Sequence, residues 1–370
     1  MKIPIQKIEI IPIEIMLNSP FNISVGSISK AQNTVVIIHS EDGHFGTGEC
    51  GRLRSIRAET PESVVTIGKY LAPVLIGKDA ANIRACINVL DQAFIGHSSI
   101  KCAFDMALHD LTTKVSKLSL SNYLGGSVKD KKIYTDMTVG LGSVDEMVTK
   151  AVTFKEQGFK TLKLKLGDQQ SDLERVREIR KAVGQDISLR LDANQGWNPD
   201  SAKRILRQLE PYDIQYCEAP IDATNLSGLK QITKNSPIPI MADESIFDHR
   251  DAYQLISQQI VDAINIKLTK SGGVHHAMKI ASIAESAGVV CQVGCFAETR
   301  LGISALAAFA SVWNCIQYFD MDSPLMHTSN PVKGGISYAD DWQVIWPNDI
   351  GHGASFEESF LKQFPIHLFE

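Results

Sequence analysis

About the first 60 residues alternate apolar and polar positions, which is the pattern of β-strands. Isoleucines fall at nearly every second position from Ile3 to Ile13, and residues 34–38 form a run of β-branched side chains. Side chains that alternate in this way face opposite sides of a sheet, so both runs predict strands. The tract from Glu41 to Gly46 contains Asp-Gly and is typical of a hairpin turn.

Residues 61–124 have the apolar spacing of helices. Thr60 and Pro61 form a helix start, because proline is accepted at the first helical position. Gly125 and Gly126 end this region. Residues 1–125 are therefore predicted to form an α+β domain.

From about residue 133 the pattern changes to short β-branched runs that alternate with helical stretches. The predicted strands are residues 133–139, 161–166, 187–191, 214–217, 238–241, 263–266, 289–293 and 316–319. Strands that alternate with helices form parallel βαβ units. Eight in succession over about 190 residues favour an α/β fold of the (β/α)₈ TIM-barrel type over an open sheet. No G-x-G-x-x-G motif follows a strand, which argues against a dinucleotide-binding domain.

The final segment of about 45 residues is rich in Trp, Gly, Asp and Pro and contains no further strand–helix unit. We expect it to fold back onto the first domain. The predicted organisation is an α+β domain at residues 1–125, a (β/α)₈ barrel at 126–322 and a returning C-terminal segment at 323–370.

Composition excludes several classes of protein. The chain has 370 residues, of which 44% are hydrophobic and 21% charged, and its formal net charge is −5. These are the proportions of a folded globular protein, and no basic domain indicates nucleic-acid binding. No apolar run reaches the ~20 residues of a membrane span, and the N-terminus shows no export signal. Seven cysteines without a C-x-x-C pair predict reduced, mostly buried thiols and a cytoplasmic location.

Charged residues follow most of the predicted strands, at the point where a barrel places its active site. They are Lys163 and Lys165, Asp192, Glu218, Asp243 and Glu244, Lys267, and Asp320 and Asp322. Successive members are about 25 residues apart, close to the length of one βα unit, so they should occupy the same level of successive strands. Because residues two apart on a strand face the same side, Lys163 and Lys165 should both point into the barrel.

A single charged residue at a strand end is weak evidence for a binding site. A lone lysine at a strand end is usually solvated, and a lone aspartate usually caps the next helix, as we expect of Asp200 and Asp248. The whole set differs, because several buried charges at one level are costly unless something binds there. The carboxylates of Asp192, Glu218 and Asp243 are hard oxygen ligands that suit Mg²⁺, whereas the ten histidines do not cluster as zinc would require.

Five motifs in this order resemble the enolase superfamily and, within it, the muconate-lactonizing-enzyme subgroup. They are Lys-Leu-Lys at 163–165, Arg-Leu-Asp-Ala-Asn-Gln-Gly-Trp at 190–197, Cys-Glu-Ala-Pro at 217–220, Ala-Asp-Glu-Ser at 242–245 and Asn-Ile-Lys-Leu-Thr-Lys-Ser-Gly-Gly at 265–273. The resemblance covers essentially the whole chain, and it implies that residues 1–125 are a capping domain and residues 126–322 the catalytic barrel. It implies that the three carboxylates bind Mg²⁺ and that Lys165 and Lys267 are the acid–base pair on opposite faces of a substrate.

The implied chemistry is removal of a proton α to a carboxylate, through an enediolate that the metal stabilises. A lysine must be neutral to act as the base. One lysine on each face permits a 1,1-proton transfer, and hence racemisation or epimerisation. The same pair is compatible with a one-base elimination or cycloisomerisation.

The segment after the eighth predicted strand resembles the dipeptide epimerases of this subgroup. It contains Asp320-Met321-Asp322, and in those relatives two aspartates hold the α-ammonium group of the substrate. The alternative interpretation is a polar turn before Pro324. Added carboxylates there would repel the dianionic substrates of muconate-type relatives.

Further residues are assigned to substrate binding by the same resemblance. We expect Cys295 and Phe296 to line the pocket, Lys163 to contribute to binding and Thr135 to contact the substrate, although Thr135 could equally be an ordinary strand residue. The region after the seventh strand lacks a histidine, unlike the mandelate-racemase type.

The resemblance implies inversion of the α-carbon of the C-terminal residue of a dipeptide, with L-Ala-D/L-Glu from cell-wall peptides as the expected substrate. Some relatives carry an arginine in the cap where this chain has Gly26, so Arg52, Arg54 and Arg57 are the candidates for binding glutamate. Without a positive cap charge a hydrophobic or neutral dipeptide would be favoured.

The alternatives are a muconate-type cycloisomerase or an o-succinylbenzoate synthase relative and, outside enzymes, a non-catalytic carboxylate-binding barrel. The expected partners are the dipeptide and further copies of the chain in a homo-oligomer, with no nucleic acid and no membrane.

Overall fold

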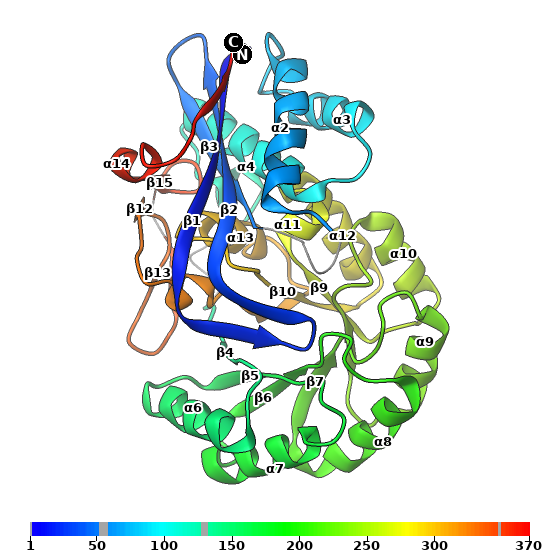
Figure 1. Cartoon of the computed structure of the whole chain (residues 1–370). Helices are drawn as coiled ribbons and strands as arrows, with labels where there is room; N and C mark the ends of the chain where they lie inside the picture. Colours follow the sequence, from blue (N-terminus) through cyan, green and yellow to red (C-terminus); the bar gives the residue numbers. More distant parts are fainter. Residues whose placement is uncertain (1, 52–57, 127–131, 347–348) are drawn as a thin grey trace.

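The computed structural model describes residues 2–51, 58–126, 132–346 and 349–370. An α+β cap, at the top of Figure 1, sits on an eight-stranded barrel, and both ends of the chain belong to the cap.

The cap is built on a four-stranded antiparallel sheet in the order β16-β1-β2-β3. Its strands are β1 (Ile5–Ile23), β2 (Gly26–Ser40), β3 (Phe45–Cys50) and β16 (His367–Phe369). The isoleucines that alternate in the sequence of β1 are buried, as their spacing predicts. The turn before β3 is also where the sequence predicts it, and Gly43 there adopts a φ of 83°, which favours glycine.

The cap helices are α2 (Pro61–Leu75), α3 (Ile83–Ala93), α4 (Ser98–Val115) and α5 (Leu120–Tyr123). As predicted, Thr60 begins α2, and its hydroxyl accepts a hydrogen bond from the Ser63 amide at 3.2 Å. Helix α4 packs on β2 and β3. It comes so close that a Cβ at Gly46 or Gly48 would collide with the α4 backbone, so both positions need glycine.

Eight parallel strands form the predicted barrel, hydrogen-bonded in chain order from β4 to β11. They are β4 (Met137–Val139), β5 (Thr161–Lys165), β6 (Ser188–Asp192), β7 (Ile214–Glu218), β8 (Ile240–Ala242), β9 (Ala263–Ile266), β10 (Val290–Val293) and β11 (Ile316–Phe319). Each of these strands lies within a predicted strand or within two residues of one. The (β/α)₈ fold expected from the alternating pattern is therefore confirmed.

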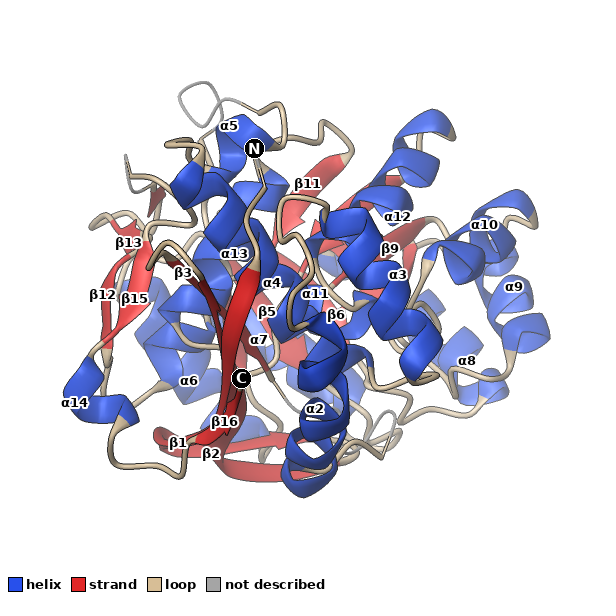
Figure 2. Ribbon diagram, turned by 90° about the horizontal axis from the view of Figure 1, so that it is seen from above, coloured by secondary structure: helices blue, strands red, loops and turns tan. Residues whose placement is uncertain are grey.

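Helices connect the strands on the outside, and Figure 2 shows α8, α9 and α10 at the rim of the molecule. The helices are α6 (Val144–Glu156), α7 (Asp172–Val183), α8 (Pro199–Leu209), α9 (Leu226–Asn235), α10 (His249–Ser257), α11 (Leu268–Ser271), α12 (Val274–Ser286) and α13 (Arg300–Ala310). Asp248 caps α10 as predicted. The prediction for Asp200 is wrong, because Asn198 accepts the capping hydrogen bond of α8 and Asp200 lies in the first turn.

The first barrel strand is shorter than predicted. Residues 133–136 lie outside β4, because Tyr134 forms a bridge with Gln343 and the Val344 amide donates to the Ile133 carbonyl at 2.7 Å. The ring closes next to this point, where the Asp136 amide donates to the Phe319 carbonyl at the end of β11 (3.2 Å).

The C-terminal segment covers one side of the barrel and returns to the cap. It contains the pairs β12 (Val332–Gly334) with β15 (Ala354–Phe356) and β13 (Ser337–Tyr338) with β14 (Val344–Ile345), followed by α14 (Glu358–Leu361). Strand β16 then pairs with β1, Phe369 opposite Ile8.

The tip of the β1–β2 hairpin, residues 21–28, bends over the mouth of the barrel (Figure 1). It is attached there by hydrogen bonds from the Leu141 amide to the Asn22 carbonyl (2.9 Å) and from the Ser24 hydroxyl to the Asn194 carbonyl (2.6 Å). We call residues 21–28 the cap hairpin tip.

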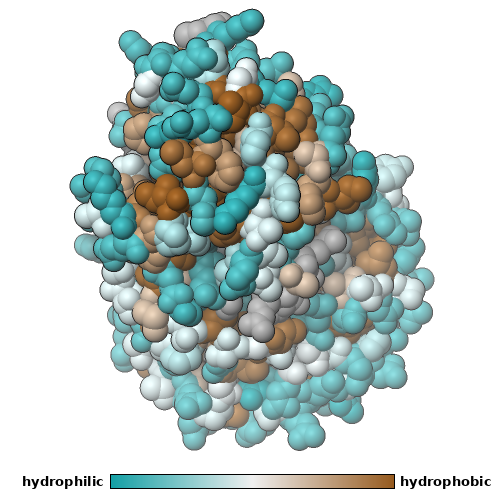
Figure 3. Space-filling view, turned by 45° about the horizontal axis from the view of Figure 1, so that its top comes forward, coloured by the Kyte–Doolittle hydropathy of each residue, from teal (hydrophilic) through white to brown (hydrophobic). Residues whose placement is uncertain are grey.

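Hydrophilic residues cover most of the face seen in Figure 3, with apolar side chains gathered towards the cap. Among the described residues, no helix combines the length and apolar character needed to cross a bilayer.

Candidate active site

Three carboxylates meet at the carboxyl ends of neighbouring strands. Asp192 ends β6, Glu218 ends β7 and Asp243 follows β8. The parallel register places Asp192 beside Glu218 and Glu218 beside Met241, so the acidic side chains share one level. One oxygen of each lies within 4.8 Å of the others, and all three residues are buried. The structure thus brings the three predicted ligands together.

The surroundings of this cluster fit a hard divalent cation. Burial and the charge of Asp192 raise the pKa of Glu218, a penalty that a cation would relieve. The oxygens Asn194 Oδ1, Glu244 Oε2 and Asn265 Oδ1 are buried beside the cluster and have no hydrogen-bond partner among the described residues. Such atoms need water or an ion. The three carboxylates could hold Mg²⁺, which retains water molecules that these oxygens could accept from.

Two lysines face each other across the barrel. Lys165 ends β5 and Lys267 follows β9, the second and sixth of the eight strands. Strands four apart in a ring of eight lie on opposite sides. Lys165 donates to Asp192 at 2.6 Å and Lys267 to Asp243 at 2.9 Å. Burial lowers the pKa of Lys267, but the charges of Asp243 and Glu218 outweigh burial and raise it overall.

A phenylalanine ring lies near each of these ammonium groups. The centroid of Phe21, in the cap hairpin tip, is 6.0 Å from Lys165 Nζ, and that of Phe296, after β10, is 4.6 Å from Lys267 Nζ. Cations are attracted to aromatic faces, and the rings also reduce the access of water. The cap hairpin tip is therefore part of the site.

Lys163 joins the carboxylate cluster to the far side of the barrel. Its ammonium lies 2.6 Å from Asp320, 3.0 Å from Glu218 and 3.7 Å from Asp192. Burial lowers the pKa of Lys163, but these carboxylates raise it well above the usual value. These contacts favour the charged ammonium form of Lys163.

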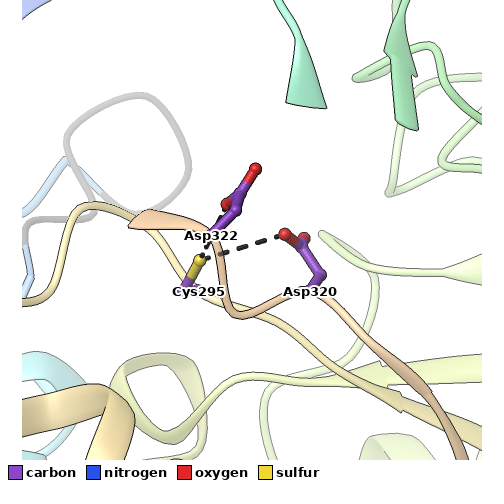
Figure 4. A group of neighbouring side chains, drawn as sticks. All are labelled: Cys295, Asp320 and Asp322. Atoms are coloured by element: carbon purple, nitrogen blue, oxygen red, sulfur yellow. Dashed lines mark hydrogen bonds between the residues drawn. The ribbon is translucent and has the colours of Figure 1, made fainter. Parts of the chain in front are cut away.

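The predicted Asp-x-Asp pair comes together after β11, with the Cys295 thiol beside it (Figure 4). Asp322 accepts from the Thr138 amide at 2.8 Å, and Cys295 Sγ lies 3.7 Å from Asp322 Oδ1 and 4.0 Å from Asp320 Oδ1. Burial and the charge of Asp320 raise the pKa of Asp322 to about 7. Within the described part of the chain no ion pair joins Asp322 to a cation, whereas Lys163 neutralises Asp320. Asp322 is therefore the aspartate of this pair that can still accept a cationic partner.

A cavity of about 360 Å³ separates the cap hairpin tip from the mouth of the barrel. Lys165, Lys267, Asp243 and Cys295 line its barrel side. This volume is in the range of small-molecule sites. The other predicted substrate contacts, Thr135, Lys163, Asp320 and Asp322, are not among the described residues that line it.

Thr135 lies beside the Asp-x-Asp segment. Its hydroxyl donates to the Asp136 carbonyl and accepts from the Met321 amide, both at 3.0 Å, so it is engaged with the main chain. Arg52, Arg54 and Arg57 lie outside the described residues.

Sequence reasoning missed two features of the site. Lys270, which is buried and donates to Asp243 and to the Asn265 carbonyl, had a signal in its position one helical turn after Lys267. Phe21 had none, because its contact with Lys165 joins segments far apart in the chain.

Fold and site together define a class: a capped (β/α)₈-barrel protein with a carboxylate metal site and paired lysines. The chain belongs to the mandelate racemase/muconate lactonizing enzyme family. Residues 6–125 match its N-terminal domain and residues 146–360 match the enolase C-terminal domain-like family.

Three solved structures show the similarity. A dipeptide epimerase from Cytophaga hutchinsonii, complexed with Mg and D-Ala-L-Val, is 40% identical, covers 100% of both chains and has a TM-score of 0.98. A dipeptide epimerase from Enterococcus faecalis, complexed with Mg and L-Leu-L-Tyr, is 37% identical over 96% of this chain and 100% of that one (TM-score 0.92). The L-Ala-D/L-Glu epimerase from Bacillus subtilis in a substrate complex is 38% identical over 96% and 99% (TM-score 0.91).

Proposed function

We propose that this chain is a Mg²⁺-dependent dipeptide epimerase that inverts the α-carbon of the C-terminal residue by two-base proton transfer. The observation that carries the proposal is the placement of Lys165 and Lys267 on opposite strands, at the level of the carboxylate cluster. The dipeptides bound in two of the similar structures and the L-Ala-D/L-Glu epimerase activity named for the third support the choice of a dipeptide.

The residues divide the work as follows. Asp192, Glu218 and Asp243 would hold Mg²⁺, which would stabilise the charge that develops on the substrate carboxylate. Lys165 and Lys267 would exchange one proton with opposite faces of the α-carbon, each serving as base for one isomer and as acid for the other.

Asp322 would bind the substrate ammonium, because it is the aspartate of the pair that Lys163 leaves free. The muconate-type alternative fits less well, since a dianionic substrate would meet this carboxylate.

The cysteines bear on where the protein is located in the cell. Among the described residues no disulfide bond forms, and all seven cysteines are buried, which supports a reducing compartment such as the cytoplasm. They are Cys50, Cys86, Cys102, Cys217, Cys291, Cys295 and Cys315. A homo-oligomer and a role in cell-wall peptide metabolism stay predictions.

The test is isotope exchange. The enzyme is incubated with a dipeptide library and MgCl₂ in D₂O, and the dipeptides are examined by mass spectrometry. An epimerase adds one mass unit at the α-carbon and produces the diastereomer. The Lys165→Ala/Lys267→Ala double variant is the control. A wild-type protein that binds Mg²⁺ yet exchanges no dipeptide would be a carboxylate-binding barrel instead.

A further inference from the structure

Glu298, in the loop between β10 and α13, is a buried carboxylate beside the cavity. It follows the segment 295–297, which lines the cavity, but does not line the cavity itself. The residue is 6% exposed. One of its carboxylate oxygens accepts from the Phe296 amide at 2.6 Å, and the other accepts from the Thr269 hydroxyl at 2.7 Å. The carboxylate therefore joins the loop after β10 to helix α11, which follows β9.

Both of these hydrogen-bond donors are neighbours of Lys267. The centroid of the Phe296 ring lies 4.6 Å from the Lys267 ammonium, and Thr269 follows Lys267 by two residues. The chain after β10 also passes close to the lysine side chain, because a Cβ at Gly294 would lie 3.0 Å from Lys267 Cε. Glu298 thus holds the segment that carries Lys267 against the aromatic ring that faces its ammonium.

The hydrogen bond between Thr269 and Glu298 has a fixed direction. The Thr269 oxygen accepts from the Gly51 amide of the cap at 3.2 Å, and the hydroxyl hydrogen is donated to Glu298. Loss of the carboxylate would leave this hydroxyl and the Phe296 amide without their acceptor, which is unfavourable where water has little access. We therefore expect the loop after β10 and α11 to shift relative to each other when the carboxylate is removed.

The surroundings of Lys165 are built from other residues. Lys165 ends β5 on the opposite side of the barrel, where the Phe21 ring of the cap hairpin tip lies near its ammonium and Asp192 accepts from it. A change at Glu298 should therefore reach Lys267 directly and Lys165 only across the barrel.

We infer that Glu298 is a positioning residue for Lys267: by holding Phe296 and Thr269 together, it keeps the Lys267 ammonium aimed at the α-carbon of the substrate. The inference rests on the proposed epimerase function and assigns a further residue to the same reaction. A shift of about 1 Å in a reacting group can lower a rate by about 100-fold, so the loss of Glu298 should be measurable.

The test separates the two faces of the substrate. Glu298→Ala is combined with Lys165→Ala, in which Lys267 alone exchanges the α-proton, and with Lys267→Ala, in which Lys165 alone exchanges it. Exchange in D₂O with MgCl₂ is followed by proton NMR, on both diastereomers of the dipeptide that the wild type exchanges fastest. We expect exchange through Lys267 to fall by at least about tenfold and exchange through Lys165 to change by less than about threefold. Equal losses, or no loss, would show that Glu298 does not position Lys267.

Two further variants distinguish positioning from general damage. Glu298→Gln keeps an oxygen for the Phe296 amide and gains an amide group that can donate to the Thr269 oxygen, so it should retain most of the exchange through Lys267. A glutamine variant as slow as the alanine variant would contradict the inference, because charge rather than position would then matter. Phe296→Leu removes only the ring and should repeat the selective loss, even where Glu298→Ala does not fold. Equal losses through both lysines in this variant would also count against the inference.

The matched control is Glu49→Ala. Glu49 is a buried carboxylate of the same region, where it accepts from Asn33, Thr299 and Gly302. Its loss should change exchange through the two lysines by the same factor. A selective loss as large as that of Glu298→Ala would mean that any damage to this region suffices, and the inference would be wrong. A wild type that exchanges no dipeptide would instead refute the epimerase function, whatever the role of Glu298.

Discussion

The ammonium of Lys163 lies 2.6 Å from the carboxylate of Asp320, and both residues are buried. Lys163→Met would leave Asp320 and Glu218 without this cation. Removing one partner of a buried pair typically costs about 3–5 kcal/mol, so the free energy of unfolding should fall by that amount. Urea denaturation at pH 7 measures it.

The control for that variant is Lys181→Met. Lys181 forms an exposed pair with Glu178 at 3.8 Å, so its loss should change stability by less than about 1 kcal/mol. A Lys163→Met protein as stable as this control would contradict the assigned role of the ion pair.

Asp322 should determine the requirement for a free amino terminus. We expect N-acetylation of a dipeptide substrate to lower kcat/KM by at least about 100-fold, because a buried anion loses its cation partner. Asp322→Asn should narrow this difference, since a neutral amide loses less when the ammonium is removed. Equal turnover of free and acetylated dipeptides by the wild-type enzyme would favour the muconate-type alternative.

The metal site is tested with Asp192→Asn, Glu218→Gln and Asp243→Asn. Each should abolish turnover and weaken Mg²⁺ binding by at least about 100-fold in titration calorimetry, because each removes a charged ligand. Asp200→Asn, at an exposed carboxylate in the first turn of α8, should bind Mg²⁺ normally. Full activity after treatment with EDTA would show that the cluster is not a catalytic metal site.

Substitution of each of the two lysines should affect a different stereoisomer of the substrate. Lys165→Ala and Lys267→Ala should each stop epimerisation, because one face has lost its proton carrier. The surviving lysine should still exchange the α-proton of one isomer in D₂O, and the two variants should select opposite isomers, which proton NMR resolves. If only one lysine acts as a base, one variant should exchange the α-proton of neither isomer, and the other variant should still epimerise the substrate.

Glu49 should make stability depend on pH. It is buried at the junction of cap and barrel, where it accepts hydrogen bonds from Asn33, the Thr299 amide and hydroxyl and the Gly302 amide. Burial nevertheless raises its pKa from 4.5 to about 7, helped by the charge of Glu298. The folded state therefore binds the proton more tightly than the unfolded state. The resulting stabilisation is complete below pH 4.5 and is lost as the pH rises through 7.

Glu49→Gln isolates this contribution, because the amide does not titrate. Relative to the variant, the wild type should lose about 2–3 kcal/mol of unfolding free energy between pH 5 and pH 8, as followed by urea denaturation. A difference between the two proteins that stays constant over this range would contradict the prediction.

The position of the carboxylate cluster was predictable from the sequence, because the spacing that determines it is local. Asp192, Glu218 and Asp243 recur at the interval of one βα unit, and the parallel register places them at one level. The contacts that the cap makes with the site were not predictable from spacing. Phe21 reaches Lys165, and Ser24 reaches Asn194, through contacts between segments that no periodicity connects.

Two sequence predictions were wrong, one because of a distant contact and one because of a local competition. Residues 133–136 have strand-like composition, yet Tyr134 pairs with Gln343 in the C-terminal segment, and this competing partner shortens β4. At α8 the polar residues Asn198 and Asp200 both have cap propensity, and the hydrogen bond that forms decides between them.

The two lysines proposed to carry the proton and the cap residues that line the cavity lie in separate segments of the chain, the cap residues within positions 21–33. Substitutions in this short stretch would therefore reshape the cavity without altering Lys165 or Lys267. Similar proteins fit this division, since 37–40% identical structures hold dipeptides as different as D-Ala-L-Val and L-Leu-L-Tyr. In such a lineage, substrate preference should diverge faster than reaction type, and a gene's chemistry should be easier to infer from its descent than its substrate.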